Sequence, residues 1–334
     1  MLQDSQKAAR LYEQAISLDP KFALAHARLS AAASIIYHWF EPTAVQKEKA
    51  RSEAKEALRL QPNLGEAHLA LGLYYYYIDS DYNRALAEFD LAGRALPNDG
   101  DVGLYIAAVR RRQGRLKESM EAYKKAEAMD PRNPVTLYDA AQTYFLLRDW
   151  KATIQGLDRV LALSPDSPTV IIERAYAEFF RTGSTRPIKE TLAKIPADID
   201  PDGTVTFARW DVALLDRDPQ TASEVLDSCP FETITTADGT PVPKTYLQGC
   251  AALVAGDNAR AQTYFEQARP VLEKTVSKSP DDAARHAHLG LLYAFMGRKD
   301  EALREGQRAR ELKPIAHDFV DGAQIEVFQA LIYS

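Results

Sequence analysis

The apolar positions along the chain are spaced as they are in helices. The segment Leu71-Gly72-x-x-Tyr75 is followed by Ala85-x-x-x-Phe89, so apolar side chains return every three or four residues. Strong helix formers (Ala, Leu, Glu, Arg and Lys) dominate, and the Val-Ile-Thr alternation that is typical of strands is sparse. The pattern predicts an all-α fold.

Tags that end in proline, usually Leu-x-Pro, divide the chain into helix pairs. Proline cannot continue a helix, and it disfavours helical dihedral angles in the residue before it. The successive intervals between tag prolines are 34 or 35 residues at Pro62, Pro97, Pro131 and Pro165, and again from Pro280 to Pro314. A constant period of this length predicts antiparallel helix pairs, each of which buries its apolar face against its neighbours.

The chain resembles the tetratricopeptide-repeat (TPR) family. In the last full repeat the matching positions are Leu289, Gly290, Tyr293, Gly297, Ala302, Ala309 and Pro314. Small residues stand where the two helices of a repeat must cross closely, namely Gly72, Ala107, Ala141 and Gly290. The resemblance implies an α-solenoid, a right-handed superhelix of antiparallel helix pairs.

The pattern predicts three parts. Residues 1–229 form an N-terminal array that is regular to residue 165 and degenerate over 166–229. Residues 230–243, rich in Thr, Gly, Asp and Pro, read as a loop and a candidate hinge. Residues 244–334 form C-terminal repeats, the last of them incomplete.

Both ends of the chain resemble parts of a longer array. Residues 4–18 read as a second helix without its partner, and residues 319–333 as a first helix without its partner. We expect the apolar residues of that last helix to face missing sequence or a partner chain: Ile325, Val327, Phe328, Leu331 and Ile332. Pro270 predicts a kink or a break in the long helix before it.

Residues 50–165 are similar to the C-terminal TPR arrays of bacterial signalling proteins, which include Ser/Thr kinases, adenylate cyclases and winged-helix regulators. The similarity lies in segments such as 59–68, 111–115 and 130–134. It implies that the chain is a regulatory or sensory module of a larger signalling protein. The expected location is cytoplasmic, or extracytoplasmic if a membrane span lies upstream.

Charge and composition narrow the function. The net charge of −6 argues against a nucleic-acid partner, which needs a basic surface. No apolar stretch is long enough for membrane insertion. The cysteines, Cys229 and Cys250, make neither a disulfide framework nor a metal site and read as small buried residues.

The chain carries no sequence motif of an enzyme. Phosphate-binding loops, dinucleotide-binding glycines, zinc helices and nucleophile elbows are absent from the sequence. His286 and His288 are two residues apart and would point to different faces of a helix, and the other histidines (His26, His38, His68 and His317) are isolated. We therefore expect no catalytic residues, no metal and no cofactor.

The TPR resemblance implies that first helices line a concave groove. This places nine candidate partner-binding residues there: Tyr76, Tyr77, Tyr105, Arg111, Tyr138, Gln142, Phe145, His288 and Phe295. Tyrosine is a favoured interface anchor, although the run Tyr74–Tyr77 could instead pack between repeats. The clamp positions of chaperone-binding TPR domains are mostly apolar or aromatic here, which argues against a chaperone tail.

Three hypotheses follow. The first is a scaffold that binds a peptide or helix of another protein in this groove. The second is the regulatory module described above, with a small ligand near residues 196–243. The third is self-association through residues 319–333.

Overall fold

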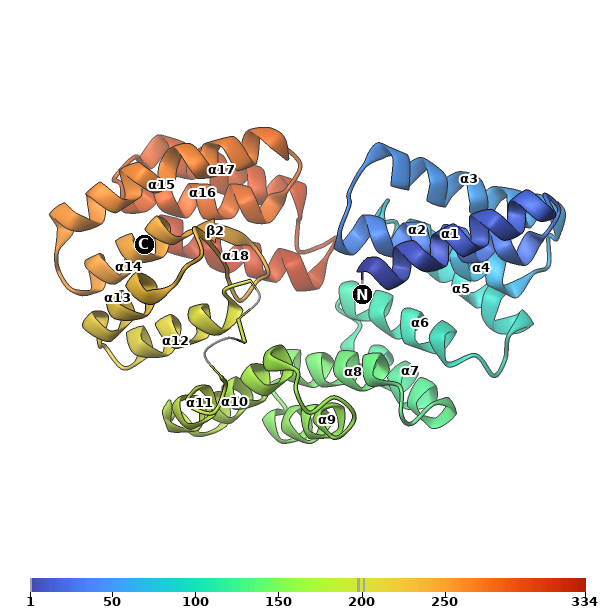
Figure 1. The fold of residues 1–334 in the computed structure, drawn as a ribbon, viewed down its shortest axis with the longest axis horizontal. Helices are drawn as coiled ribbons and strands as arrows, with labels where there is room; N and C mark the ends of the chain where they lie inside the picture. Colours follow the sequence, from blue (N-terminus) through green and yellow to red (C-terminus); the bar gives the residue numbers. More distant parts are fainter. Residues whose placement is uncertain (1, 197–198, 201) are drawn as a thin grey trace. The chain divides into compact units, whose positions relative to one another are not determined.

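The computed structural model describes residues 2–196, 199–200 and 202–334 and is shown in Figure 1. It confirms the all-α solenoid predicted from the repeat, with one short hairpin. The helices of the first half are α1 (Leu2–Leu18), α2 (Ala23–Trp39), α3 (Ala44–Leu60), α4 (Gly65–Tyr77), α5 (Tyr82–Ala95), α6 (Gly100–Arg112), α7 (Leu116–Met129), α8 (Pro134–Leu146) and α9 (Trp150–Leu163).

The second half holds the remaining helices and both strands that the described residues contain. These are α10 (Pro168–Thr182), α11 (Arg186–Leu192), α12 (Thr204–Leu215), α13 (Pro219–Ser228), β1 (Thr233–Thr235), β2 (Pro241–Pro243), α14 (Lys244–Val254), α15 (Asn258–Lys278), α16 (Ala283–Phe295), α17 (Lys299–Leu312) and α18 (Phe319–Tyr333).

The chain forms two compact units, Met1–Thr143 and Tyr144–Ser334, and the division falls within α8. We call them the N-terminal unit and the C-terminal unit. In the first, α2 packs on α3, α4 on α5 and α6 on α7; in the second, α14 packs on α15 and α16 on α17. Each pair is one repeat, so the predicted helix pairs are present.

The segment 230–243 is not the loop that its composition predicts. Strands β1 and β2 pair in antiparallel fashion, with Ile234 opposite Val242. Both side chains are fully buried in one cluster with residues of α12, α14 and α15. Alternation of buried and exposed positions over three residues is too short a pattern to be recognised among so many turn-forming residues. The hinge assigned to this segment stays a prediction.

Two further expectations need correction. Helix α15 is continuous through Pro270, so the predicted break is wrong, whereas the alternative of a kink stays a prediction. In α18, three of the five apolar residues expected to face outwards pack inside the C-terminal unit: Ile325 against Ala283 and Ala287, Phe328 against His288, and Ile332 beside Gly290. Only Val327 and Leu331 are exposed, because α18 packs on both α16 and α17.

Glycine is required where the first helix of a repeat crosses the second. A Cβ atom added at Gly72 would lie 2.4 Å from Cε1 of Phe89, and one at Gly249 would lie 2.3 Å from Cε1 of Phe265. Both phenylalanines are fully buried and cannot move aside. This steric limit is the physical reason for the small residue at this position of the repeat.

The substitution Gly72→Ala should therefore destabilise the N-terminal unit by about 1–3 kcal/mol through overpacking, in spite of the better helix propensity of alanine. Gly93→Ala is the matched control, because its Cβ would meet Val102 at an ordinary 3.5 Å. That variant should be as stable as the wild type or more so. Urea unfolding followed by circular dichroism compares them, and a Gly72→Ala protein of unchanged stability would contradict the steric argument.

Three histidines fasten their repeats in the same way. Nε2 of His26, His68 and His286 lies 3.0–3.1 Å from the carbonyl oxygen of the proline six residues earlier: Pro20, Pro62 and Pro280. Nδ1 of each lies 2.5–2.7 Å from a glutamate of the second helix: Glu53, Glu88 and Glu305. We call this arrangement the histidine staple. It joins the linker before a repeat to both helices of that repeat.

The staple has a consequence for charge. At His286 both ring nitrogens face acceptors, a carbonyl oxygen and a carboxylate, and this arrangement favours the imidazolium form, which donates from both nitrogens. The hydrogen bond with Glu305, which outweighs the effect of burial, raises the pKa of His286 above its ordinary 6.5. His26, His68 and His286 are therefore held by hydrogen-bonding groups on both ring nitrogens and are not isolated side chains.

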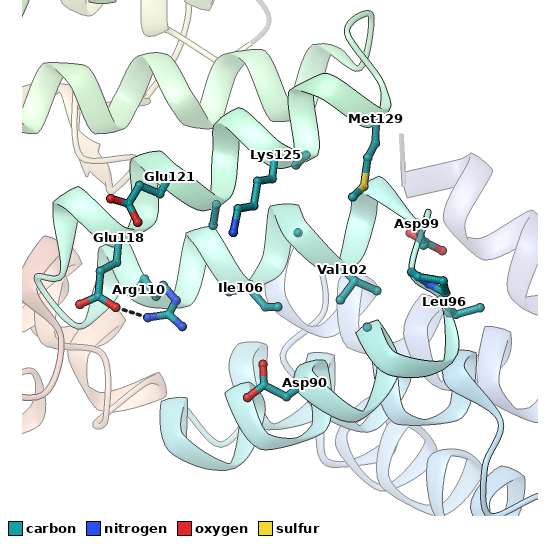
Figure 2. Close-up of a pocket in the computed structure, with 15 residues that line it drawn as sticks. Asp90, Leu96, Asp99, Val102, Ile106, Arg110, Glu118, Glu121, Lys125 and Met129 are labelled. Atoms are coloured by element: carbon teal, nitrogen blue, oxygen red, sulfur yellow. Dashed lines mark hydrogen bonds and ion pairs between the residues drawn. The ribbon is translucent and has the colours of Figure 1, made fainter.

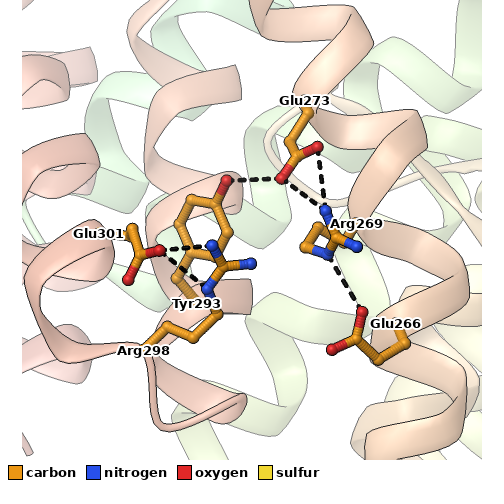
Figure 3. A network of polar contacts seen from close by, with 6 residues as sticks. All are labelled: Glu266, Arg269, Glu273, Tyr293, Arg298 and Glu301. Carbon is orange, nitrogen blue, oxygen red and sulfur yellow. Dashed lines mark hydrogen bonds and ion pairs between the residues drawn. The ribbon is translucent and has the colours of Figure 1, made fainter.

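A polar network joins α15, α16 and α17 in the C-terminal unit (Figure 3). The Tyr293 hydroxyl donates to Glu273 at 2.8 Å, and Arg269 bonds both Glu273 and Glu266. The guanidinium of Arg298 lies 4.7 Å from the centre of the Tyr293 ring. Burial, aided by Glu273, raises the pKa of Tyr293 to about 12, so its hydroxyl keeps the proton that it donates.

Candidate functional site

The aromatic face of the N-terminal unit is built by the last turns of α2 and α4 and the middle of α6. Helices α2 and α4 each end on a pair of aromatic rings, His38-Trp39 and Tyr76-Tyr77. The ring centres of Tyr77 and His38 are 4.4 Å apart, and Tyr77 meets Tyr105 edge-on at 6.2 Å. Residues 38, 39, 76, 77 and 105 define this face.

One side of the aromatic face packs on the core of the unit, and the other side, at Trp39, is exposed to solvent. Tyr105 stacks on the buried Phe89 at 5.7 Å, and Tyr76 lies 6.1 Å from Tyr82. Burial raises the pKa of the Tyr77 and Tyr105 hydroxyls, so both keep their protons and can donate hydrogen bonds. Trp39 is 62% exposed. A large exposed indole beside immobilised rings is the kind of surface that binds apolar side chains.

A charged pair lies at the α6–α8 side of the same unit. Arg111 donates from Nη1 to the backbone oxygen of Asp139 at 2.9 Å, and its Nη2 is 3.4 Å from Oδ1 of that residue. Burial opposes the charge, but Asp139 and Tyr123 outweigh it, and the pKa of Arg111 is raised. The Tyr123 hydroxyl donates to Asp139 Oδ2 at 3.4 Å. Arg111 is therefore engaged within the fold.

The structure brings together only part of the predicted set. Tyr76, Tyr77 and Tyr105 belong to the aromatic face, although Tyr76 itself is buried. Tyr138 and Gln142, both half-buried, flank Asp139 on α8. The four consecutive tyrosines Tyr74–Tyr77 point to different faces of one helical turn. Tyr74 and Tyr76 are buried, whereas Tyr75 and Tyr77 are half-buried.

The other three predicted residues, Phe145, His288 and Phe295, all lie in the C-terminal unit. Phe145 packs edge-on against Trp150 at 5.3 Å and Phe180 at 5.5 Å. Phe295 stacks on the buried Phe265 at 5.4 Å. Phe295 thus packs against the core of the C-terminal unit, and Phe145 belongs to a small aromatic cluster with Trp150 and Phe180.

His288 is not a surface residue. It is 4% exposed, and its Nε2 lies 3.0 Å from Oδ2 of Asp238, at the tip of the β1–β2 hairpin. Its Nδ1 is buried and has no hydrogen-bond partner among the described residues. Asp238 also accepts from the Thr240 amide at 3.0 Å and from the Thr236 hydroxyl. The hairpin covers the position that was expected to meet a partner.

Sequence reasoning missed two features that the chain does signal. Trp39 is not among the residues predicted to bind a partner, although α2 and α4 both end on an aromatic pair. His26 and His68 read as isolated and His286 as a poor metal pair with His288, although each of the three stands six residues after a tag proline. In both cases the signal becomes visible only when the repeats are aligned with one another.

The repeated helix pairs, the close glycine crossings and the tag prolines together define a TPR fold. No family model matches the sequence, and no curated protein matches it. Among the described residues, no helix is both long and apolar enough to cross a lipid bilayer.

Solved structures of TPR proteins are similar in fold. Tom70 of yeast has a TM-score of 0.57 at 12% identity, over 99% of this chain and 86% of that one. A tetratricopeptide repeat protein of Parabacteroides merdae has a TM-score of 0.53 at 14% identity, over 81% and 99%. PilW, a type IV pilus biogenesis factor, has a TM-score of 0.51 at 18% identity, over 60% and 90%. The chain therefore has the fold of tetratricopeptide-repeat proteins.

Proposed function

We propose that this chain is a protein-interaction scaffold that binds a peptide or a helix of a partner on the aromatic face of the N-terminal unit. The observation that carries the proposal is Trp39, which is largely exposed beside rings that the fold holds in place. Burial of such an anchor contributes most of the affinity in many interfaces. Preordered rings also lose little conformational entropy on binding.

The test uses peptides selected from a random phage-displayed library on the purified chain. Trp39→Ala should weaken binding of a selected peptide by about tenfold or more, which is the effect of losing a central aromatic anchor. Val45→Ala is the control, because Val45 is 70% exposed and lies outside the face. Peptides that bind both variants equally would refute this location.

The regulatory role in a larger bacterial signalling protein stays an alternative, supported by the sequence similarity of residues 50–165. The region proposed for its small ligand uses its apolar side chains internally, since Ile234 and Val242 are fully buried. A thermal-shift screen with metabolites tests it, because a bound ligand raises the unfolding temperature.

Self-association through α18 is a third proposal. Only the apolar residues of α18 that remain exposed are available for it. Val327, Leu331 and Tyr333 are 60%, 50% and 68% exposed. If this surface joins two copies, sedimentation of Val327→Lys/Leu331→Lys should show a monomer where the wild type shows a dimer. A wild-type monomer at high concentration would exclude the surface.

A further inference from the structure

The aromatic face carries hydrogen-bond donors beside its rings. Burial is the main cause that raises the pKa of Tyr77 and Tyr105. A hydrogen bond between their hydroxyls raises the pKa of Tyr77 further and acts against the rise at Tyr105, so Tyr77 is the donor. Tyr105 keeps its own proton, and no group among the described residues accepts it. The exposed indole N–H of Trp39 also has no acceptor in the described part of the chain.

The rings of the face lie in one row across three helices. Trp39 and His38 end α2, Tyr77 ends α4, and Tyr105 lies in α6. From Trp39 to Tyr105, neighbouring ring centres are 4.6, 4.4 and 6.2 Å apart. A segment that lies along this row therefore meets aromatic surface at each step and a donor without a partner at both ends.

The regular backbone conformations differ in how well they satisfy such donors. An α-helix uses its carbonyl oxygens internally, except in its last turn. A β-strand offers free carbonyl oxygens, but it also brings N–H groups that need acceptors. A polyproline II segment has no internal hydrogen bonds, and each of its prolines offers a carbonyl oxygen without an N–H. This third conformation is the best match for rings with free donors.

We propose that the aromatic face binds a proline-rich segment of a partner protein in the polyproline II conformation. The proline rings would pack on Trp39 and Tyr77, and carbonyl oxygens would accept from the Trp39 indole and the Tyr105 hydroxyl. Such a segment is already extended before it binds, so it loses little conformational entropy on an ordered face. This inference rests on the proposed function and names the class of peptide that the scaffold binds.

A cavity in the same unit offers a different kind of surface. Its volume is about 360 Å³, and Figure 2 shows it between α5, α6 and α7. It shares no residue with the aromatic face, and its lining includes the carboxylates of Asp90, Asp99, Glu118 and Glu121. Carboxylates only accept hydrogen bonds, and a proline-rich segment brings acceptors rather than donors. The cavity is therefore a poor match for this ligand and supplies a control position.

The test measures binding of acetylated decaproline amide to the whole chain by NMR titration, with a glycine–serine decamer as the comparison. Decaproline should bind at least about tenfold more tightly than the flexible decamer, which must be ordered on binding. Trp39→Ala should weaken decaproline binding by about tenfold or more. Tyr105→Phe keeps the ring and removes the donated proton, so it should weaken binding by about two- to tenfold.

Two variants control for the location. Tyr12→Phe removes a hydroxyl from α1, outside the face, and Ala122→Leu narrows the cavity of Figure 2. Both should bind decaproline as the wild type does. Equal binding of the two probes, or full affinity of decaproline for Tyr105→Phe, would overturn the proposal.

The peptides selected from the phage library separate this inference from the proposed function. They should be enriched in proline and should lose affinity in Trp39→Ala. Selected peptides that depend on Trp39 but lack proline, together with no binding of decaproline, would overturn this inference and leave the scaffold role of the face in place. Selected peptides that do not depend on Trp39 would refute the face itself.

Discussion

Replacement of Asp238 by alanine is expected to destabilise the C-terminal unit by about 1–3 kcal/mol for each buried polar group that loses its hydrogen-bond partner. The substitution removes the acceptor for His288 Nε2, for the Thr240 amide and for the Thr236 hydroxyl. It also leaves both nitrogens of a buried imidazole without partners, since Nδ1 of His288 already has none among the described residues.

Hydrogen exchange is the suitable measurement, because a repeat protein need not unfold in a single step. Amides of the hairpin and of α16 should exchange faster in Asp238→Ala, while those of the N-terminal unit keep the wild-type rates. Glu232→Ala, an exposed change at the base of the hairpin, is the control. Unchanged protection of α16 would show that the hairpin does not depend on this pair.

The Asp238 interaction also has a predictable pH dependence. Burial acts to raise the pKa of Asp238, but the hydrogen bonds from His288, Thr236 and Thr240 together lower it below the ordinary 3.8. A carboxyl with a lowered folded-state pKa stabilises the protein above pH 3.8, and this stabilisation is lost as the pH falls through the lower value. The difference in stability between the wild type and Asp238→Ala should therefore become smaller only in strong acid, below pH 3.8.

The second large effect is expected from the histidine staples. Glu53→Gln/Glu88→Gln removes the charged acceptor from both staples of the N-terminal unit, and each loss should cost about 1.5–3 kcal/mol, the contribution of a hydrogen bond to a charged group. Glu56→Gln is the control: Glu56 also lies on α3 but pairs with the exposed Arg59. Urea unfolding at pH 6 compares the double variant with Glu56→Gln. Equal stability of these two proteins would show that the staples do not stabilise the fold.

The pH profile tests the charge of the staple at His286. Because the folded-state pKa of His286 is raised above 6.5, its stabilisation is complete below pH 6.5 and is lost as the pH rises through the folded value. Protection of α16 and α17 should decline on this alkaline side in the wild type and should stay level in Glu305→Gln. A wild-type profile that is flat across this range would contradict an imidazolium at His286.

The helix pairs could be predicted from the sequence because their causes are local. Tag prolines end helices, Asp99 and Asp282 cap the next ones, and Gly72 and Gly290 mark the crossings. The hairpin could not be predicted in this way. Its strands have three residues each, and burial of Ile234 and Val242 depends on helices far away in the sequence.

The candidate site shows the same division. The sequence indicated that tyrosines of first helices would matter, and Tyr77 and Tyr105 do form one face. It could not indicate that His288 is covered by Asp238, fifty residues away, or that Arg111 is already engaged by Asp139. Such pairings depend on which side chains the packed repeats bring together.

By itself, the sequence determined the repeat, the helix boundaries and the class of fold, because periodicity, capping and proline placement act within one or two turns of a helix. The tertiary structure alone decided which aromatic rings are exposed and which side chains the buried histidines contact. The physical reason is that burial and hydrogen-bond partners are set by neighbours in space, and in a repeat protein these neighbours come from adjacent repeats.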